Sequence, residues 1–201
     1  MWLRRLDLQR NLLSVSSLPL RAYESFAKRV NALETLLLCH NPLRTITDDI
    51  ACFSRLKELD LDDTHITALP RSLAQLRSLT SFSCSDNALG VIDETVSLPE
   101  SLESLTLAHC GLRSVPVAWG DALTRLKHLD LSNNAISELP ASYNAISQLT
   151  TLNLAHNHLR RFPAFVASNV GLLEIDLSSN AGIDAIPADI YQLADLRRLD
   201  L

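Results

Sequence analysis

Apolar residues recur along the chain in a fixed pattern, in which two alternating apolar residues follow a first leucine by three and five positions. The first leucines of successive copies lie about 23 residues apart after one longer first step of 30, at Leu3, Leu33, Leu56, Leu79, Leu102, Leu126, Leu149, Leu172 and Leu196. A period of this length is typical of a solenoid, in which each unit packs mainly on its neighbours.

Each unit predicts one short strand and one return segment. In the sixth copy, Leu129 and Leu131 alternate with polar residues, which is the period of two expected for a strand with one buried face. Pro140 then fixes a corner, and Tyr143 and Ile146 are spaced by three. This spacing predicts a loose helix or 3-10 turn that returns the chain to the same edge.

The unit L-x-x-L-x-L-x-x-N-x-L, usually followed by x-x-L-P, resembles the leucine-rich repeat family. Matches run from LRRLDLQRNLL at the first copy through LKHLDLSNNAI at the sixth to a cut-off LRRLDL at the ninth. The Leu-Pro corner and the period are most similar to the intracellular Ras-group, Scribble-like type. The resemblance implies an α/β fold, namely a curved horseshoe with short parallel strands on its concave face and helical or 3-10 turns on its convex face.

We expect a single leucine-rich repeat domain over residues 1–201, with eight repeats and a truncated ninth. An insertion at residues 14–32 places Tyr23, Phe26 and Val30 at helical spacing and predicts an outer helix. The chain starts and stops inside a repeat, where leucines would face water. We therefore expect either that it is a piece of a longer protein or that partners cover both ends.

Two units depart from the pattern, and two asparagine positions are substituted. The fourth unit loses its Leu-Pro corner at Ile92, and the eighth carries an extra residue near Gly182, which predicts a small bulge. Asparagine is expected to satisfy backbone groups where the chain leaves each strand, less completely where threonine or cysteine replaces it. The slot holds Asn11, Asn41, Thr64, Asn87, Cys110, Asn134, Asn157 and Asn180.

Charge and cysteine usage restrict the partners and the compartment. A net charge of -5 and a pI near 5.6 disfavour affinity for a phosphate backbone, so no nucleic acid partner is expected. The four cysteines form no C-x-x-C pair, no signal peptide is recognisable, and no apolar run is long enough for a membrane span. We predict a cytoplasmic protein with no membrane span.

Candidate chemistry is sparse. The five glycines are scattered, and neither a G-x-S-x-G nor an H-E-x-x-H motif occurs. His40, His109 and His156 occupy the same slot of three units, but strand spacing puts them about 10 to 14 Å apart, too far to share a zinc ion. We predict no enzymatic activity, no metal and no cofactor.

The exposed side of the strands carries the candidate partner-binding residues. Small and acidic side chains dominate this side, and five acidic ones, Glu58, Asp60, Asp62, Asp63 and Asp86, form one acid cluster. The cluster is either a docking patch for a basic partner segment or a solubilising choice that discourages edge pairing. The apolar Leu37 is expected to lie exposed beside it. The full candidate set is Leu37, Glu58, Asp60, Asp62, Asp63, Ser83, Asp86, Thr106, His128, Asp130, Asn153 and Asp176.

These observations predict a scaffold that binds a partner protein through its concave strand face. A rigid array presents side chains at fixed spacing, so little entropy is lost on binding. Two alternatives stay open. One is a structural subunit of a large assembly, held by its ends and convex side. The other is a regulatory repeat segment of a larger signalling enzyme.

Overall fold

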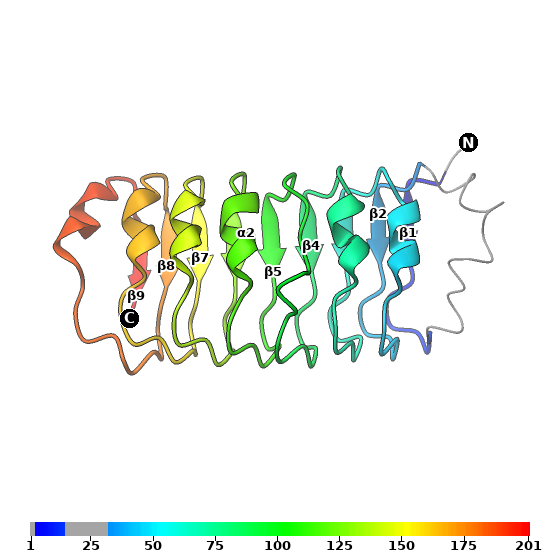
Figure 1. Ribbon diagram of the computed structural model, residues 1–201, viewed down its shortest axis with the longest axis horizontal. Helices are drawn as coiled ribbons and strands as arrows, with labels where there is room; N and C mark the ends of the chain where they lie inside the picture. The colour runs from blue at the N-terminus through cyan, green and yellow to red at the C-terminus, as the bar shows by residue number, and fades with distance from the viewer. Residues whose placement is uncertain (1–2, 15–31) are drawn as a thin grey trace.

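The structure is a computed structural model that describes residues 3–14 and 32–201. The helix predicted within the insertion lies outside these residues. The described chain forms one sheet of nine parallel strands in sequence order, which stand side by side in Figure 1. The strands are β1 (Arg5–Asp7), β2 (Thr35–Leu37), β3 (Glu58–Asp60), β4 (Ser81–Ser83), β5 (Ser104–Thr106), β6 (His128–Asp130), β7 (Thr151–Asn153), β8 (Glu174–Asp176) and β9 (Arg198–Asp200).

The strands pair in the register of the repeat. Leu36 lies opposite Leu59, Leu59 opposite Phe82, and Phe82 opposite Leu105. The central residue of every strand is therefore aligned with its counterpart in the next unit. This alignment confirms the predicted α/β solenoid. The central residues such as Leu59 face the core, and the third and fifth residues of each unit lie on the opposite side of the sheet.

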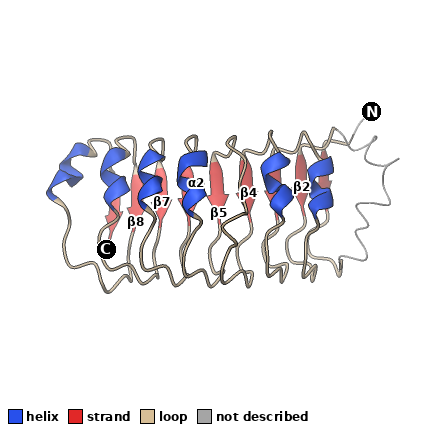
Figure 2. Ribbon diagram, in the orientation of Figure 1, coloured by secondary structure: helices blue, strands red, loops and turns tan. Residues whose placement is uncertain are grey.

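Short helices return the chain between most strands and line up along one side of the sheet (Figure 2). Five of the six helices in the described residues begin directly after a proline, which occupies the N-cap position. The proline ring fixes φ at about -65°, and proline has no backbone N–H that would need an acceptor. The helices are η3 (Asp48–Cys52), η4 (Arg71–Gln75), α2 (Val117–Ala122), η5 (Ala141–Ala145), η6 (Ala164–Ser168) and η7 (Ala188–Gln192), where η denotes a 3-10 helix.

The core is a continuous column between the sheet and the helices. Leucines of successive units such as Leu126 and Leu149 are fully buried in it. Larger side chains fill the helix layer: Tyr143 and Phe165 meet edge to face with ring centroids 6.3 Å apart, and Trp119 donates its indole N–H to the carbonyl of Val96 at 2.8 Å. Many similar burials therefore hold the fold together.

Buried asparagines satisfy backbone groups where the chain leaves the strand, as predicted, and they also connect their unit to the one before it. The Asn134 side-chain N–H₂ donates to the carbonyls of Leu107 and Leu131, and its Oδ1 accepts from the backbone N–H groups of Cys110 and Leu112. One amide thus satisfies groups of two units at once.

The substituted asparagine slots make fewer bonds of this kind. Thr64 donates its hydroxyl to the Leu61 carbonyl at 2.6 Å, and the Cys110 thiol lies 3.2 Å from the Cys84 carbonyl. A further asparagine in the helix layer, Asn169, makes the same kind of link between units, because its Oδ1 accepts the Leu149 N–H at 2.9 Å. The repeat pattern alone did not indicate this second link.

Glycine permits a close approach at two places. A Cβ on Gly120 in α2 would lie 2.4 Å from the Ser142 carbonyl carbon in η5, and a Cβ on Gly182 would lie 2.5 Å from the Leu159 carbonyl oxygen. The extra residue of the eighth unit lies beside Gly182, in a turn closed by the Ile183 N–H and the Asn180 carbonyl at 3.1 Å. Within the described chain, no helix is long and apolar enough to cross a membrane.

Candidate functional site

The side of the sheet that faces away from the helices, called here the strand face, carries the third and fifth residue of every unit. The register places Asp60 next to Ser83, Thr106 next to Asp130, and Asn153 next to Asp176. The predicted site residues on β3 to β8 therefore form two neighbouring columns across the sheet. Their side chains are partly buried or exposed, as a binding surface requires.

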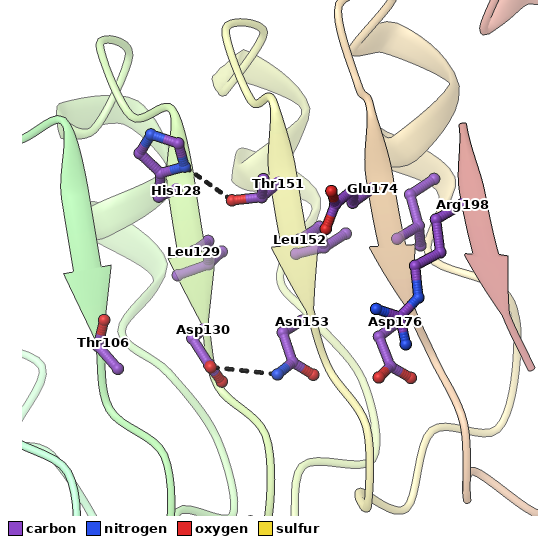
Figure 3. A pocket seen from close by; sticks show the side chains of 11 residues that line it. Thr106, His128, Leu129, Asp130, Thr151, Leu152, Asn153, Glu174, Asp176 and Arg198 are labelled. Carbon is purple, nitrogen blue, oxygen red and sulfur yellow. Dashed lines mark hydrogen bonds between the residues drawn. The ribbon is translucent and has the colours of Figure 1, made fainter. Parts of the chain in front are cut away.

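A shallow hollow of about 190 Å³ lies in the strand face across β5 to β9 (Figure 3). It contains five of the predicted residues, namely Thr106, His128, Asp130, Asn153 and Asp176. It also contains three polar residues that were not among the candidates, Thr151, Glu174 and Arg198. These three belong to the third-residue column, so the strand register was the signal that could have found them.

Hydrogen bonds between neighbouring strands hold the hollow's side chains in place. His128 Nδ1 lies 2.8 Å from Thr151 Oγ1, and the Asn153 side chain donates to Asp130 Oδ2 at 3.1 Å. Both bonds cross from β6 to β7 (Figure 3). Side chains fixed in this way lose little freedom when a ligand binds.

The hollow has an excess of negative charge. Asp130, Glu174 and Asp176 contribute three carboxylates, whereas the guanidinium of Arg198 is engaged with Asp200 at 2.7 Å. The Asp200 carboxylate raises the pKa of Arg198, and Asp176 and Glu174 act in the same direction. The arrangement suits a cationic group better than an anionic one.

Aspartates of the fifth-residue column also serve the backbone. Oδ1 of Asp60 accepts the N–H of the residue two positions later at 3.0 Å, and Asp130 and Asp176 do the same at 2.9 and 3.0 Å. These N–H groups stand where the strand ends and the ladder no longer supplies an acceptor. The aspartate column therefore has a structural role in addition to its charge.

Asp62 of the acid cluster supplies the same bond to the next unit. That unit has Ser83 in place of the fifth-residue aspartate, and Asp62 Oδ1 accepts both the Ser83 hydroxyl and the Ser85 N–H at 2.6 Å. Burial raises the pKa of Asp62, while the bonds from Ser83 and Ser85 oppose the shift. One unit later, the Ser85 hydroxyl accepts the Ala108 N–H at 3.1 Å in the same manner.

Asp63 lies between two histidines. Its Oδ2 is 3.0 Å from His40 Nδ1, and its Oδ1 is 3.9 Å from His65 Nδ1. Glu58 is partly buried on β3, and Asp86 is exposed. The acid cluster is thus made of side chains with different surroundings, two of which already have partners in neighbouring units.

The slot that holds His40, Asp63 and Asp86 has a left-handed backbone in every unit described. Its φ angles run from 49° to 58° in Arg10, His40, Asp63, Asp86, His109, Asn133, His156 and Ser179. Asparagine, aspartate and histidine are the non-glycine residues that tolerate this conformation best. The recurrence of histidine at this slot therefore has a conformational reason. Among the described residues, no group of three or more histidine, cysteine or acidic side chains is placed to hold a metal ion.

The expectation for Leu37 is wrong. It was predicted to be an exposed apolar residue, but it is only 5% exposed. Leu37 sits between Asp7 on β1 and Asp60 on β3, which flank it on both sides of its strand. Next to it, burial raises the pKa of the Cys39 thiol to about 12, so this cysteine is a poor nucleophile.

The sequence matches the model of the "Leucine rich repeat" family over residues 25–94 and 100–159, more than half of the chain. An adenylate cyclase of Podospora anserina is 32% identical over 187 residues, which are 92% of this chain and 7% of that protein. Tsukushi of Xenopus tropicalis is 33% identical over 122 residues, 58% of this chain and 33% of that protein. The chain thus spans a minor part of these relatives.

Solved structures show the same architecture. A leucine-rich repeat protein of Leptospira interrogans superposes with a TM-score of 0.88 at 26% identity, over 99% of this chain and 48% of that one. The Arabidopsis receptor kinase HAESA, in complex with the peptide hormone IDA and the co-receptor SERK1, superposes with a TM-score of 0.78 at 26% identity, over 99% of this chain and 34% of that one.

Proposed function

The chain belongs to the leucine-rich repeat family, and from this premise we propose that it binds a partner protein through its strand face. The observation that carries the proposal is the hollow over β5 to β9, where polar side chains of five strands surround one depression. Inter-strand bonds such as that between Asn153 and Asp130 fix these side chains before any partner arrives. A preorganised surface of this kind needs no rearrangement to bind.

The partner segment is a basic one. Asp130, Glu174 and Asp176 leave the hollow with an excess of negative charge, and the acid cluster extends this charge over β3 and β4. Lysine or arginine side chains entering the hollow would meet carboxylates and increase the rate of association. Because the surface is open to water, the attraction will weaken as salt is added.

An extended peptide fits the shape of the surface. The strand face presents equivalent positions at one strand spacing, about 4.8 Å, so successive groups of an extended segment can meet successive units. The similarity to HAESA, whose structure holds a peptide hormone, supports a peptide as the bound element. The Ras-group subtype and the cytoplasmic location remain predictions, since the similar structures also include a receptor ectodomain.

We expect Glu174→Gln to weaken binding of a basic partner. Glu174 lines the hollow and is exposed, so its replacement removes a charge without opening the core. Peptides selected on the immobilised 201-residue chain from a random display library can be titrated against both forms at low and moderate salt. We expect a loss of about fivefold or less for one exposed charge and a weaker salt dependence in the variant.

Glu138→Gln is the matched control. Glu138 is equally exposed but lies outside the strand face, in the turn before η5. Its replacement changes the net charge by the same amount and should leave the affinity unchanged. Selected peptides that lack basic residues, or that respond equally to both substitutions, would refute strand-face binding of a basic segment.

A second candidate function is a regulatory repeat segment within a larger signalling enzyme. The match to adenylate cyclase favours it, because nearly the whole of this chain aligns with a small part of that protein. We propose that these residues contribute binding and not catalysis in such an enzyme. An antibody against the chain would then detect a protein much larger than 22.2 kDa in the source cells. Detection of a single band at 22.2 kDa would rule this candidate out.

A further inference from the structure

Within residues 32–201, the row of helices on one side of the sheet is interrupted between β4 and β5. Helices η3 and η4 pack together, as do α2, η5, η6 and η7 in sequence. All residues between β4 and β5 are described, and they form turns in place of a helix. Figure 1 shows the resulting gap between the teal helix η4 and the green helix α2, which leaves β4 and β5 without a helix in front of them.

The cause of the gap lies in the fourth unit. At the position where five of the described units have an apolar residue followed by proline, this unit has Ile92 and Asp93. The Asp93 side chain accepts the Thr95 N–H at 2.8 Å, which closes a tight turn of the kind that aspartate favours. The second unit also lacks this proline and still forms η3 after Thr47, so the competing turn at Asp93 is what distinguishes the fourth unit.

A groove of about 790 Å³ occupies the gap. The ends of η4 and α2 contribute its walls, and the segment before β5 contributes its floor. Its lining residues are Ala74, Arg77, Ser97, Leu98, Pro99, Glu100, Ser101, Ala122, Thr124 and Arg125. Most of these side chains are small, so the groove has room for a segment of another chain.

The chain that runs through the gap is tied to the elements on both sides. Arg71 in η4 forms a salt bridge with Asp93 at 3.8 Å. On the other side, the Val117 N–H in α2 donates to Glu94 Oε2 at 3.1 Å, and Trp119 bonds to the carbonyl of Val96. The groove is therefore bounded by a braced segment, which favours binding without rearrangement.

The walls of the groove are positively charged, although the protein as a whole is acidic. Arg77 and Arg125 are exposed on opposite walls, and neither forms a salt bridge with another described residue. The neighbouring Glu103 is held by Lys127 at 2.8 Å. Glu100, exposed between the walls, is the one carboxylate that lines the groove.

We propose that this groove docks an extended acidic segment of a partner protein, with one carboxylate meeting each arginine. Arg77 precedes β4 and Arg125 precedes β6, so two strand spacings, about 10 Å, separate their backbones. In a polyproline II segment, an extended helix with three residues per turn, residues three apart lie on the same side at about 9 Å from each other. The groove lies on the side of the sheet opposite to the strand face, so this docking is independent of the proposed function.

A fluorescently labelled peptide with two glutamates separated by two alanines provides the test. We expect saturable binding to the intact 201-residue chain by fluorescence anisotropy. Arg77→Ala and Arg125→Ala should each weaken binding up to about fivefold. Glu100→Gln should strengthen it, because this change removes the carboxylate that repels the peptide. The same peptide with glutamines in place of the glutamates should bind much more weakly.

Arg113→Ala is the matched control, because Arg113 is exposed in a turn outside the groove and its replacement should leave binding unchanged. The proposal is overturned if the peptide does not bind, if the glutamine peptide binds equally, or if all three arginine variants behave alike. Self-association of the chain that Arg77→Ala abolishes would assign the groove to a second copy and would also overturn it.

Discussion

At the scale of single residues, several polar side chains on the surface accept hydrogen bonds from backbone N–H groups of the repeat. Asp60, Asp130 and Asp176 each accept an N–H at the end of their own strand. Where the fourth unit has Ser83 at that position, Asp62 of the preceding unit accepts the equivalent N–H. The acidic character of this surface therefore follows partly from hydrogen-bond needs at the strand ends.

We expect Asp62→Ala to destabilise the fold. The variant leaves the N–H of the buried Ser85 without its acceptor, which costs about 1 to 3 kcal/mol. Urea unfolding followed by circular dichroism measures the change. Asp86→Asn is a suitable control, since the neighbouring Asp86 is exposed and asparagine tolerates its left-handed backbone, so this change should alter the free energy of unfolding little. Equal effects of the two substitutions would contradict the assignment.

Asp62→Asn should reveal the effect of the charge alone. The amide keeps an oxygen acceptor for Ser83 and Ser85, so the hydrogen bonds persist. Burial raises the pKa of Asp62, so the folded protein binds this proton more tightly than the unfolded chain. Its contribution to stability is then greatest below the unfolded pKa and decreases as the pH rises through the folded pKa. We expect the free energy of unfolding of the variant, measured with urea from acidic to neutral pH, not to show this decrease.

At the scale of elements, the sequence of each return segment determines whether a helix covers the side of the sheet opposite to the strand face. Proline precedes five of the six described helices. The fourth unit has Asp93 in that place and no helix, although all of its residues are described. Close packing of α2 on η5 depends on Gly120, which leaves room for the backbone of Ser142. Small sequence changes in the return segment thus produce both the gap and the tightest helix contact.

We expect Gly120→Ala to destabilise the protein, although alanine is the better helix former. The added methyl group would lie 2.4 Å from the Ser142 carbonyl carbon, and overpacking against backbone costs about 1 to 3 kcal/mol. Gly171→Ala is the matched control, because the nearest atom there is 3.9 Å away. Thermal unfolding should show a lower Tm for the first variant and an unchanged or higher Tm for the second.

At the scale of the whole molecule, the solenoid has two separate surfaces, the strand face with its acidic hollow and the convex groove with its two arginines. Nine strands in sequence order bury one column of leucines. Each unit contacts mainly its neighbours, so the cost of losing a side chain depends on its place along the array.

We expect Leu152→Ala to cost about 2 to 5 kcal/mol, because Leu152 is buried in a strand with neighbours on both sides. Leu199→Ala should cost clearly less, since Leu199 is partly buried and β9 pairs with only β8 among the described strands. Denaturant titrations of both variants measure the difference. Equal costs would argue that the array unfolds without any dependence on position.

Much of the fold could be predicted from local pattern. The two-residue alternation around Leu129 and Leu131, the Leu-Pro corners and the asparagine slot correctly indicated the strands, most helices and the links between units. Each of these features depends on the chain's own neighbours along the sequence, and repetition then multiplies one local solution through the array. Five of the hollow's eight polar residues could be predicted in the same way, because the strand register follows from the period.

Other features depend on how one unit stacks on the next. Leu37 is buried by residues of other units. The bond that the Ser85 N–H donates to Asp62 and the pairing of His40 with Asp63 each join residues more than twenty positions apart. No local period encodes these contacts. The same holds for the groove, since the missing corner at Ile92 does not indicate which charges line the opening. Composition and spacing therefore specified the repeat, whereas stacking in three dimensions decided which side chains were already engaged and which remained available for a partner.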